Sequence, residues 1–303
     1  MIGDMQKWTP NVAGIIEHAR EIHPKTEVIS RLVSGEIHRT NYEEVCIRSR
    51  KLGSALEKDG VKKGDVVATL ALNTYRHLEM YYGISGMGAI THTLNFRLHP
   101  EQAIYIINHA EDKIIFVELP FVPILEGLQD KLSTVEKYIV LCEQSEMPET
   151  SLKNVISYEE YIKDGDENYD WPELDDDAAC ALCYTSGTTG NPKGVLYSHK
   201  SNVIHAQAAL TAMTIKPDDS ILMVVPLFHV LAWGIPYFGP MNGLKLVMPG
   251  MQMEGEPLYE LIDKEDITLA FGVPTIWMGL LAYCRDNNKI LSSVKNTIIG
   301  GSA

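Results

Sequence analysis

Short apolar runs alternate along this chain with segments of helical periodicity. Residues 66–70, 114–117 and 138–141 are rich in aliphatic side chains and each follows a polar turn, which predicts buried strands. Residues 75–87 and 100–110 between them have the spacing of amphipathic helices. Strands and helices in alternation are typical of a largely parallel sheet covered by helices. The pattern predicts an α/β fold.

The second half of the chain continues the alternation. Its predicted elements are, in order, a helix over 198–213, a strand over 221–226, a strand over 244–248, a helix over 257–265, and short strands over 267–271 and 297–299. Gly83, Gly86 and Gly88 lie in or just after the 75–87 helix, where each glycine costs about 1 kcal/mol relative to alanine. Close approach of this helix to the sheet is the favoured explanation, and a ligand contact is the alternative.

The acidic charge is concentrated in one segment. The formal net charge is −14, and residues 143–177 hold thirteen acidic residues against two lysines. This excess argues against a nucleic acid as the main partner, because an acidic surface repels a polyanion. The segment is predicted to be a solvated connector, with a functional acidic surface as the alternative.

The cysteines and the hydropathy indicate a cytoplasmic protein. The five cysteines are scattered, and the N-terminus lacks the apolar core of a secretion signal. Cys180 and Cys183 have the CxxC spacing of a zinc or redox pair, but their apolar neighbours favour a buried strand. The longest apolar run, residues 221–233, is too short for a transmembrane segment, which needs about 20 residues.

The most distinctive segment is the loop over residues 184–194, which reads YTSGTTGNPKG. Its glycines, Gly187, Gly190 and Gly194, permit backbone conformations in which successive N–H groups converge on an anion. Further hydrogen-bond donors are the ammonium group of Lys193 and the hydroxyl groups of Thr185, Ser186, Thr188 and Thr189. The loop differs from the P-loop pattern, because Lys193 is followed by glycine. We interpret it as a phosphate-binding loop, and an ordinary turn is the alternative.

This loop resembles the signature of the adenylate-forming superfamily, which includes acyl-CoA synthetases, firefly luciferase and the adenylation domains of peptide synthetases. Residues 226–234 (PLFHVLAWG), 272–275 (GVPT) and 300–303 (GGSA) resemble later motifs of this family, in the same order. The likeness is to bacterial fatty-acyl-CoA synthetases of the medium- and long-chain type. It covers essentially the whole chain.

The resemblance implies an N-terminal large domain of two stacked, mostly parallel sheets with interleaved helices. Residues 64–205 would form a first α/β subdomain, and residues 10–60 together with 206–303 would form a second. The domain would be incomplete at Ala303. A ribose-binding aspartate and a small C-terminal domain with a catalytic lysine follow this point in the family, and both are expected to be absent from this chain.

The resemblance also implies roles for individual residues. The phosphates of ATP would be held by Thr185, Ser186, Gly187, Thr188, Thr189, Gly190 and Lys193. The segment near the adenine and the adenylate would be Gly300, Gly301, Ser302 and Ala303. Lys193 and His229 would be catalytic, and Thr185 would contact Mg²⁺. The acyl substrate would meet His229, Trp233, Val273 and Thr275, with Trp233 gating its tunnel. As alternatives, His229 is a capping residue, Trp233 a core aromatic and Gly300 a simple turn.

Formation of an acyl-adenylate is mainly a task of positioning and charge neutralisation. A carboxylate oxygen attacks the α-phosphorus of ATP while pyrophosphate leaves, and no enzyme nucleophile is needed. Amino-acid-activating relatives carry an aspartate where this chain has His229, which argues against an α-amino acid. An apolar lining suited to an alkyl chain is predicted from Phe228, Leu231, Trp233, Val273, Ile276, Trp277 and Met278. The chain length is left open, and so is a short thioether acid.

The leading hypothesis is therefore an ATP-dependent carboxylate–CoA ligase. A medium- or long-chain fatty acid and ATP would give an acyl-adenylate, and the thiol of CoA would then displace AMP. One alternative keeps the adenylation but uses another acyl acceptor. The other is a non-catalytic binder of nucleotides or acyl groups. A homodimer is left open.

Overall fold

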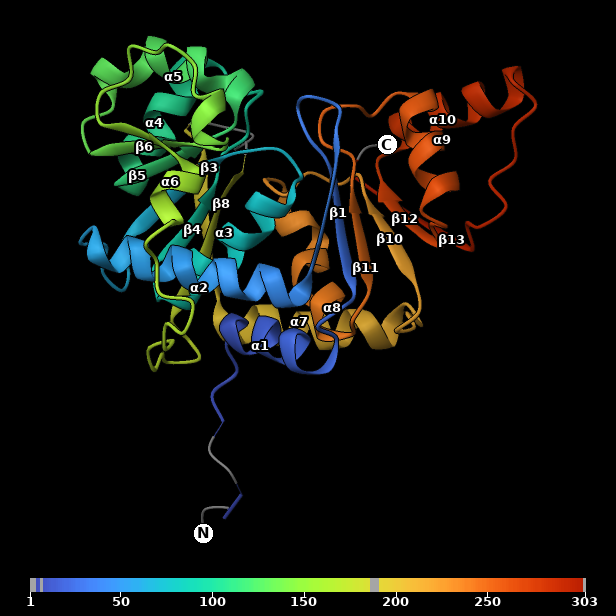
Figure 1. The fold of residues 1–303 in the computed structure, drawn as a ribbon, viewed down its shortest axis with the longest axis horizontal. Coiled ribbons are helices and arrows are strands. Elements are labelled where there is room, and N and C mark those ends of the chain that lie inside the picture. The colour runs from blue at the N-terminus through green and yellow to red at the C-terminus, as the bar shows by residue number, and fades with distance from the viewer. Residues whose placement is uncertain (1–3, 6–7, 186–190, 302–303) are drawn as a thin grey trace.

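The computed structural model describes residues 4–5, 8–185 and 191–301, which form two sheets with helices between and outside them (Figure 1). The seven-stranded sheet has the order β7-β6-β5-β3-β4-β8-β9. Its strands are β3 (Val66–Leu70), β4 (Ile90–Thr93), β5 (Ile114–Val117), β6 (Lys137–Val140), β7 (Val155–Ser157), β8 (Ala179–Thr185) and β9 (Lys193–Ser198). Every neighbouring pair is parallel except β8 and β9, which form an antiparallel hairpin.

The six-stranded sheet has the order β13-β12-β10-β11-β1-β2. Its strands are β1 (Glu27–Arg31), β2 (Ile37–Asn41), β10 (Ser220–Met223), β11 (Lys245–Met248), β12 (Leu269–Gly272) and β13 (Asn296–Ile299). Only the β1–β2 hairpin is antiparallel. The early hairpin therefore joins a sheet whose other strands begin at Ser220, at least 179 residues after the end of the hairpin at Asn41. The prediction of two mostly parallel sheets with interleaved helices is confirmed.

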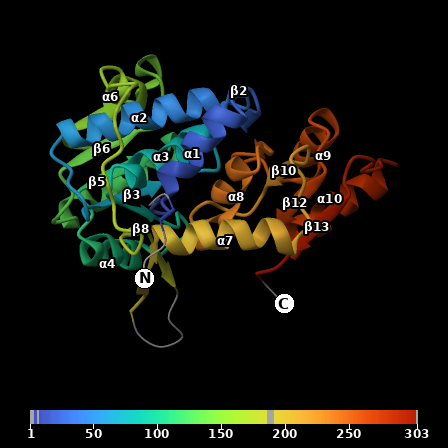
Figure 2. The ribbon, with the colours of Figure 1, turned by 90° about the horizontal axis from the view of Figure 1, so that it is seen from below.

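Five helices lie between the sheets (Figure 1, Figure 2): α1 (Val12–Ile22), α2 (Tyr42–Lys58), α3 (Tyr75–Gly86), α7 (His199–Ala212) and α8 (Ile235–Met241). The outer face of the seven-stranded sheet is covered by α4 (Pro100–Ala110) and α5 (Val122–Leu128), and α6 (Tyr158–Ile162) packs beside α2. On the six-stranded sheet the outer helices are α9 (Gly255–Lys264) and α10 (Pro274–Asp286). None of these helices has the length and apolarity needed to cross a membrane.

The strands alternate their side chains between two cores, as the period of a strand requires. In the six-stranded sheet, Val28, Leu246 and Met223 face the helices between the sheets, whereas Ile29 and Val247 face α9 and α10. The inner cluster also includes side chains of α1, α2, α3, α7, α8 and β8. One continuous apolar core therefore fastens the two sheets to each other.

Two predictions about local structure are wrong. The glycines of α3 permit close contact with α2 and its surroundings, since a Cβ at Gly83 would lie 2.7 Å from Leu52 and one at Gly86 would lie 2.7 Å from Trp171. The helix thus approaches another helix and a connecting segment rather than the sheet. The acidic stretch 143–177 is also more than a connector, because it contains β7 and α6.

The predicted strand over 221–226 ends three residues early. Strand β10 stops at Met223, and the Asn73 amide then donates to the carbonyl oxygens of Met223 and Val225, each at 2.8 Å. These bonds satisfy two carbonyl oxygens that a longer strand would pair within the sheet, and one further bond to β12 remains, from the Val225 N–H to the Phe271 carbonyl oxygen at 3.2 Å. The chain is thereby released from the sheet toward residues 226–234, which carry predicted site residues.

Candidate functional site

The predicted phosphate loop joins the two strands of the β8–β9 hairpin, at the edge of the seven-stranded sheet. Thr185 ends β8, Lys193 begins β9, and the two residues lie opposite each other. Both are exposed, and the Thr185 hydroxyl donates to the Lys193 carbonyl oxygen at 3.5 Å. Five predicted phosphate ligands, Ser186, Gly187, Thr188, Thr189 and Gly190, lie outside the described residues.

Tyr184 anchors the base of this hairpin. Its hydroxyl lies 2.6 Å from Nδ1 of His109 in the last turn of α4, and burial raises the pKa of the phenol to about 12. Its ring crosses Gly194 on the opposite strand, where an added Cβ would lie 3.3 Å from the tyrosine Cζ. Gly194 therefore permits a close cross-strand contact. It is a residue of β9 without a positive φ, so the unusual backbone conformation expected from the sequence is not found at this glycine.

A second group of predicted residues gathers at the carboxyl ends of three parallel strands. His229 follows β10, Val273 follows β12, and Gly300 and Gly301 follow β13. Because parallel strands end at the same edge of a sheet, these residues are brought together although up to 72 positions separate them. Ligands of open α/β sheets bind at this edge.

The Trp233 indole is the centre of this group. A Cβ at Gly300 would lie 3.2 Å from the indole, and one at Gly301 would lie 3.9 Å from the indole and 3.2 Å from the Val273 side chain. Gly301 also has a φ of +93°, which favours glycine. The two glycines therefore let the backbone pass directly against Trp233 and Val273. Ser302 and Ala303 lie outside the described residues.

His229 and Thr275 occupy the exposed margin of the group. His229 precedes the short turn η4 (Val230–Gly234), and its side chain is exposed. Thr275 lies in the first turn of α10 and is also exposed. An exposed imidazole is free to meet a ligand, which a histidine satisfied in the core is not.

The predicted apolar lining is only partly correct. Trp277 is 6% exposed and packs with Gly272 and the outer cluster of α9 and α10, whereas Met278 is 68% exposed. Successive residues of a helix are turned by about 100°, so residues 276–278 of α10 point in different directions. Phe228, Leu231, Trp233 and Val273 still share the region of the turn.

Thr93 and Cys183 link the hairpin to the His229 turn. The Thr93 hydroxyl on β4 lies 3.4 Å from the Cys183 sulfur and 3.4 Å from the Phe228 carbonyl oxygen. Burial raises the pKa of the Cys183 thiol, whereas the N–H groups of Val230 and Leu231 lower it. Cys183 stands two residues before Thr185, and Phe228 stands one before His229. The predicted site thus consists of two half-sites, the hairpin with Thr185 and Lys193 and the turn with His229 and Trp233, and these half-sites lie next to each other.

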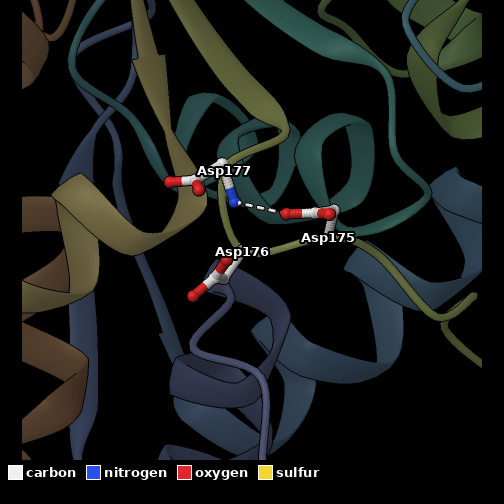
Figure 3. A group of neighbouring side chains, drawn as sticks. All are labelled: Asp175, Asp176 and Asp177. Carbon is white, nitrogen blue, oxygen red and sulfur yellow. Dashed lines mark hydrogen bonds between the residues drawn. The ribbon is translucent and has the colours of Figure 1, made fainter.

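The two cysteines of the CxxC spacing lie on a buried strand. Cys180 and Cys183 are both buried on β8, as the strand interpretation predicted, and no disulfide joins them. The one acidic group with the spacing of a metal site among the described residues is Asp175, Asp176 and Asp177 (Figure 3). It lies before the first residue of β8, at the opposite end of the strand from Thr185, and Lys200 pairs with two of its carboxylates.

Nothing in the sequence indicated the residues that fix the backbone of the segment carrying His229 and Trp233. Asn73, Tyr81, Tyr82 and Thr93 contact the segment 223–236 through hydrogen bonds. Between 135 and 154 positions separate them from their partners. A spacing pattern carries no signal at this range, and only the meeting of the two sheets brings these groups together.

Comparison with known proteins gives a consistent result. The family described as AMP-binding enzyme matches residues 16–303. The chain is 44% identical to a 3-methylmercaptopropionyl-CoA ligase of Ruegeria pomeroyi, over 100% of this chain and 57% of that protein. It is also 44% identical to a medium-chain-fatty-acid–CoA ligase of Ectopseudomonas oleovorans, over 100% of this chain and 56% of that protein. The chain thus spans little more than half the length of these relatives.

The fold has a counterpart among solved structures. The anthranilate CoA ligase AuaEII, in complex with anthranoyl-AMP, superposes with a TM-score of 0.88 at 22% sequence identity. The match covers 100% of this chain and 57% of that one. At this identity the likeness concerns the fold alone.

Proposed function

Because this chain belongs to the AMP-binding enzyme family, we propose that it is part of an ATP-dependent carboxylate–CoA ligase. The reaction would pass through an acyl-adenylate, with release first of pyrophosphate and then, after attack by the CoA thiol, of AMP. The observation that carries the proposal is the convergence of the Thr185–Lys193 hairpin and the His229 turn on Thr93 and Cys183. The names of the relatives supply the reaction type.

The two half-sites suit the two reactants. The backbone and hydroxyl groups of the hairpin loop would hold the phosphates of ATP, and the ammonium of Lys193 would offset charge on the departing pyrophosphate. The exposed Thr185 hydroxyl is an oxygen ligand of the kind that Mg²⁺ accepts, and the ion would neutralise phosphate charge. His229 would orient the carboxylate toward the α-phosphorus. Gly300 and Gly301 would let the backbone approach the adenine.

The acyl group is proposed to be a carboxylic acid with an apolar tail. Trp233 and Val273 offer partly exposed apolar surface in the region of His229, whereas Phe228 and Leu231 are buried. Each methylene that such a surface buries contributes about 0.8 kcal/mol. A medium- or long-chain fatty acid and a short thioether acid both fit this chemistry. Parallel assays with octanoate and 3-(methylthio)propanoate would distinguish them.

Exchange of labelled pyrophosphate into ATP, dependent on the carboxylic acid, tests the adenylation step in the full-length gene product. We expect Lys193→Ala to lower the exchange rate by about 100-fold, the usual loss when one group that stabilises the transition-state charge is removed. Lys153→Ala is the matched control, because Lys153 is a surface lysine paired with Asp130 on another part of the molecule. Equal exchange rates in both variants would refute the assignment of the phosphate loop.

A further inference from the structure

The turn that carries Trp233 has an uncommon backbone. Val230, Leu231, Ala232 and Trp233 have φ values of 47°, 53°, 47° and 55°, and Gly234 continues at 82°. Four successive residues with side chains thus adopt the left-handed conformation, which costs roughly 1–2 kcal/mol for each. Such a turn persists only where the surrounding structure determines it.

Two consecutive tyrosines of α3 bind the two ends of this turn. The Tyr81 hydroxyl donates to the carbonyl oxygen of Leu227, and the Tyr82 hydroxyl donates to that of Pro236. Both side chains are fully buried, and burial raises the pKa of each phenol well above its ordinary value. The hydroxyls therefore stay protonated and keep donating across the physiological pH range.

Asn73 completes the attachment at the first end. Its amide nitrogen donates to Met223 and Val225, and its amide oxygen accepts from the Leu227 N–H at 2.8 Å. The side chain is 3% exposed and uses both its oxygen and its nitrogen. Asn73 lies in the connection from β3 to α3, and the two tyrosines lie on α3, which packs between the two sheets (Figure 1).

We infer that Asn73, Tyr81 and Tyr82 are positioning residues, which hold the segment from Leu227 to Pro236 so that His229 and Trp233 face the substrate. None of the three is itself assigned a contact with the reactants. The inference rests on the proposed function, because the turn is taken to receive the carboxylic acid. It also explains how four left-handed residues are maintained: both flanks are fixed to one rigid helix, so the intervening turn has little freedom to relax.

Tyr82→Phe tests the inference, since it removes one hydroxyl and keeps the ring. Hydrogen exchange is measured on the full-length gene product, and we expect the amides of residues 230–235 to exchange roughly fivefold faster, the fold-change of one net hydrogen bond. Tyr42→Phe is the matched control. Tyr42 is equally buried and donates to the Leu244 carbonyl oxygen outside the turn, so loss of its hydroxyl should leave the exchange rates of the amides of residues 230–235 unchanged. Exchange in Tyr82→Phe that equals the control overturns the inference.

Kinetics then separate the positioning role from a purely structural one. In the pyrophosphate-exchange assay we expect Tyr82→Phe to raise the KM for octanoate about fivefold and to leave the KM for ATP unchanged. Asn73→Asp keeps the acceptor for the Leu227 N–H but loses the two bonds donated to Met223 and Val225. This substitution should therefore also raise the KM for octanoate. Faster hydrogen exchange with an unchanged KM for octanoate would overturn the inference. Absence of exchange activity in the wild type would instead refute the proposed function, and the amide measurement would still show whether Tyr82 holds the turn.

Discussion

Glu118 is a buried carboxyl group at the carboxyl end of β5. It is 4% exposed, and its side chain accepts from the Leu72 N–H at 3.3 Å. Burial raises its pKa from the ordinary value of 4.5 to about 7, against the lowering effects of the Leu72 N–H and Arg76. Strands β3 and β5 are neighbours here, but the connections that follow them lead to opposite sides of the sheet. Such a switch point leaves a crevice in many α/β folds, and in this chain the buried Glu118 carboxyl group lies there against the Leu72 N–H.

The raised pKa of Glu118 predicts a loss of stability as the pH rises. Between about pH 4.5 and pH 7 the native protein keeps a proton that the unfolded chain releases, so the free energy of unfolding falls through this window. We expect Glu118→Gln to remove up to roughly 3 kcal/mol of this dependence. Urea unfolding of both proteins at pH 5 and pH 8 measures it. If the free energy of unfolding changes between pH 5 and pH 8 by the same amount in the wild type and the variant, Glu118 does not titrate in this range.

Three helices are joined at the element scale by a buried ion network. Arg48 of α2 donates to Glu79 of α3 at 2.7 Å and to Glu159 of α6 at 3.0 Å, and Glu159 also pairs with Arg76 at 2.8 Å. The Glu79 side chain is fully buried, and the Tyr158 hydroxyl donates to its second oxygen. Of these residues, Tyr158 and Glu159 belong to the acidic stretch that the sequence presented as a connector. The Glu159 carboxylate therefore acts in packing rather than in solvation.

Removing one charged partner of this network is expected to lower the free energy of unfolding by more than removing both Arg48 and Glu79. Arg48→Met leaves the Glu79 carboxylate buried without its cation, which should lower the free energy of unfolding by about 3 kcal/mol. The double variant Arg48→Met/Glu79→Leu removes both charges and should recover at least half of that loss. Arg285→Met, in an exposed pair with Asp286, should cost less than about 0.5 kcal/mol. Chemical denaturation gives all three values, and strictly additive effects of the Arg48 and Glu79 substitutions would contradict the coupling.

At the scale of the whole molecule, one end of the described structure exposes apolar side chains. Met278 and Leu281 on α10 are 68% and 60% exposed, and Ile299 on the edge strand β13 is 55% exposed. An edge strand also presents unpaired backbone N–H and C=O groups. Apolar surface next to a free strand edge favours contact with another chain.

We expect the 303-residue chain to self-associate through this surface. The double variant Met278→Lys/Leu281→Lys should shift the association to at least tenfold higher concentration, because two charges would have to be desolvated in the contact. Ile22→Lys is the control, since Ile22 is 59% exposed at the end of α1, away from α10. Sedimentation velocity over a concentration series reports the change. An unaltered profile of the double variant would exclude this surface as the contact.

Much of the architecture could be predicted from local patterns. Strands such as β3 and β5 and helices such as α4 and α7 lie within a residue or two of their predicted bounds. The predictions failed where a distant partner decides the conformation: Asn73 ends β10 early, and α2 with Trp171 accounts for the glycines of α3. For the site, the motif residues from Thr185 to Gly301 could be proposed from the sequence, but the apolar lining from α10 could not be assigned correctly.

The sequence by itself determined the alternation of strands and helices, the glycine-rich loop behind β8 and the family to which its motifs point. These features depend on neighbours within a few residues, and local periodicity and backbone freedom encode them. Only the tertiary structure decided that Thr93 and Cys183 join the two half-sites, and that Tyr81, Tyr82 and Asn73 fix the left-handed turn before α8. These contacts join residues 90 or more positions apart. They form because the core between the two sheets brings distant segments within hydrogen-bond distance.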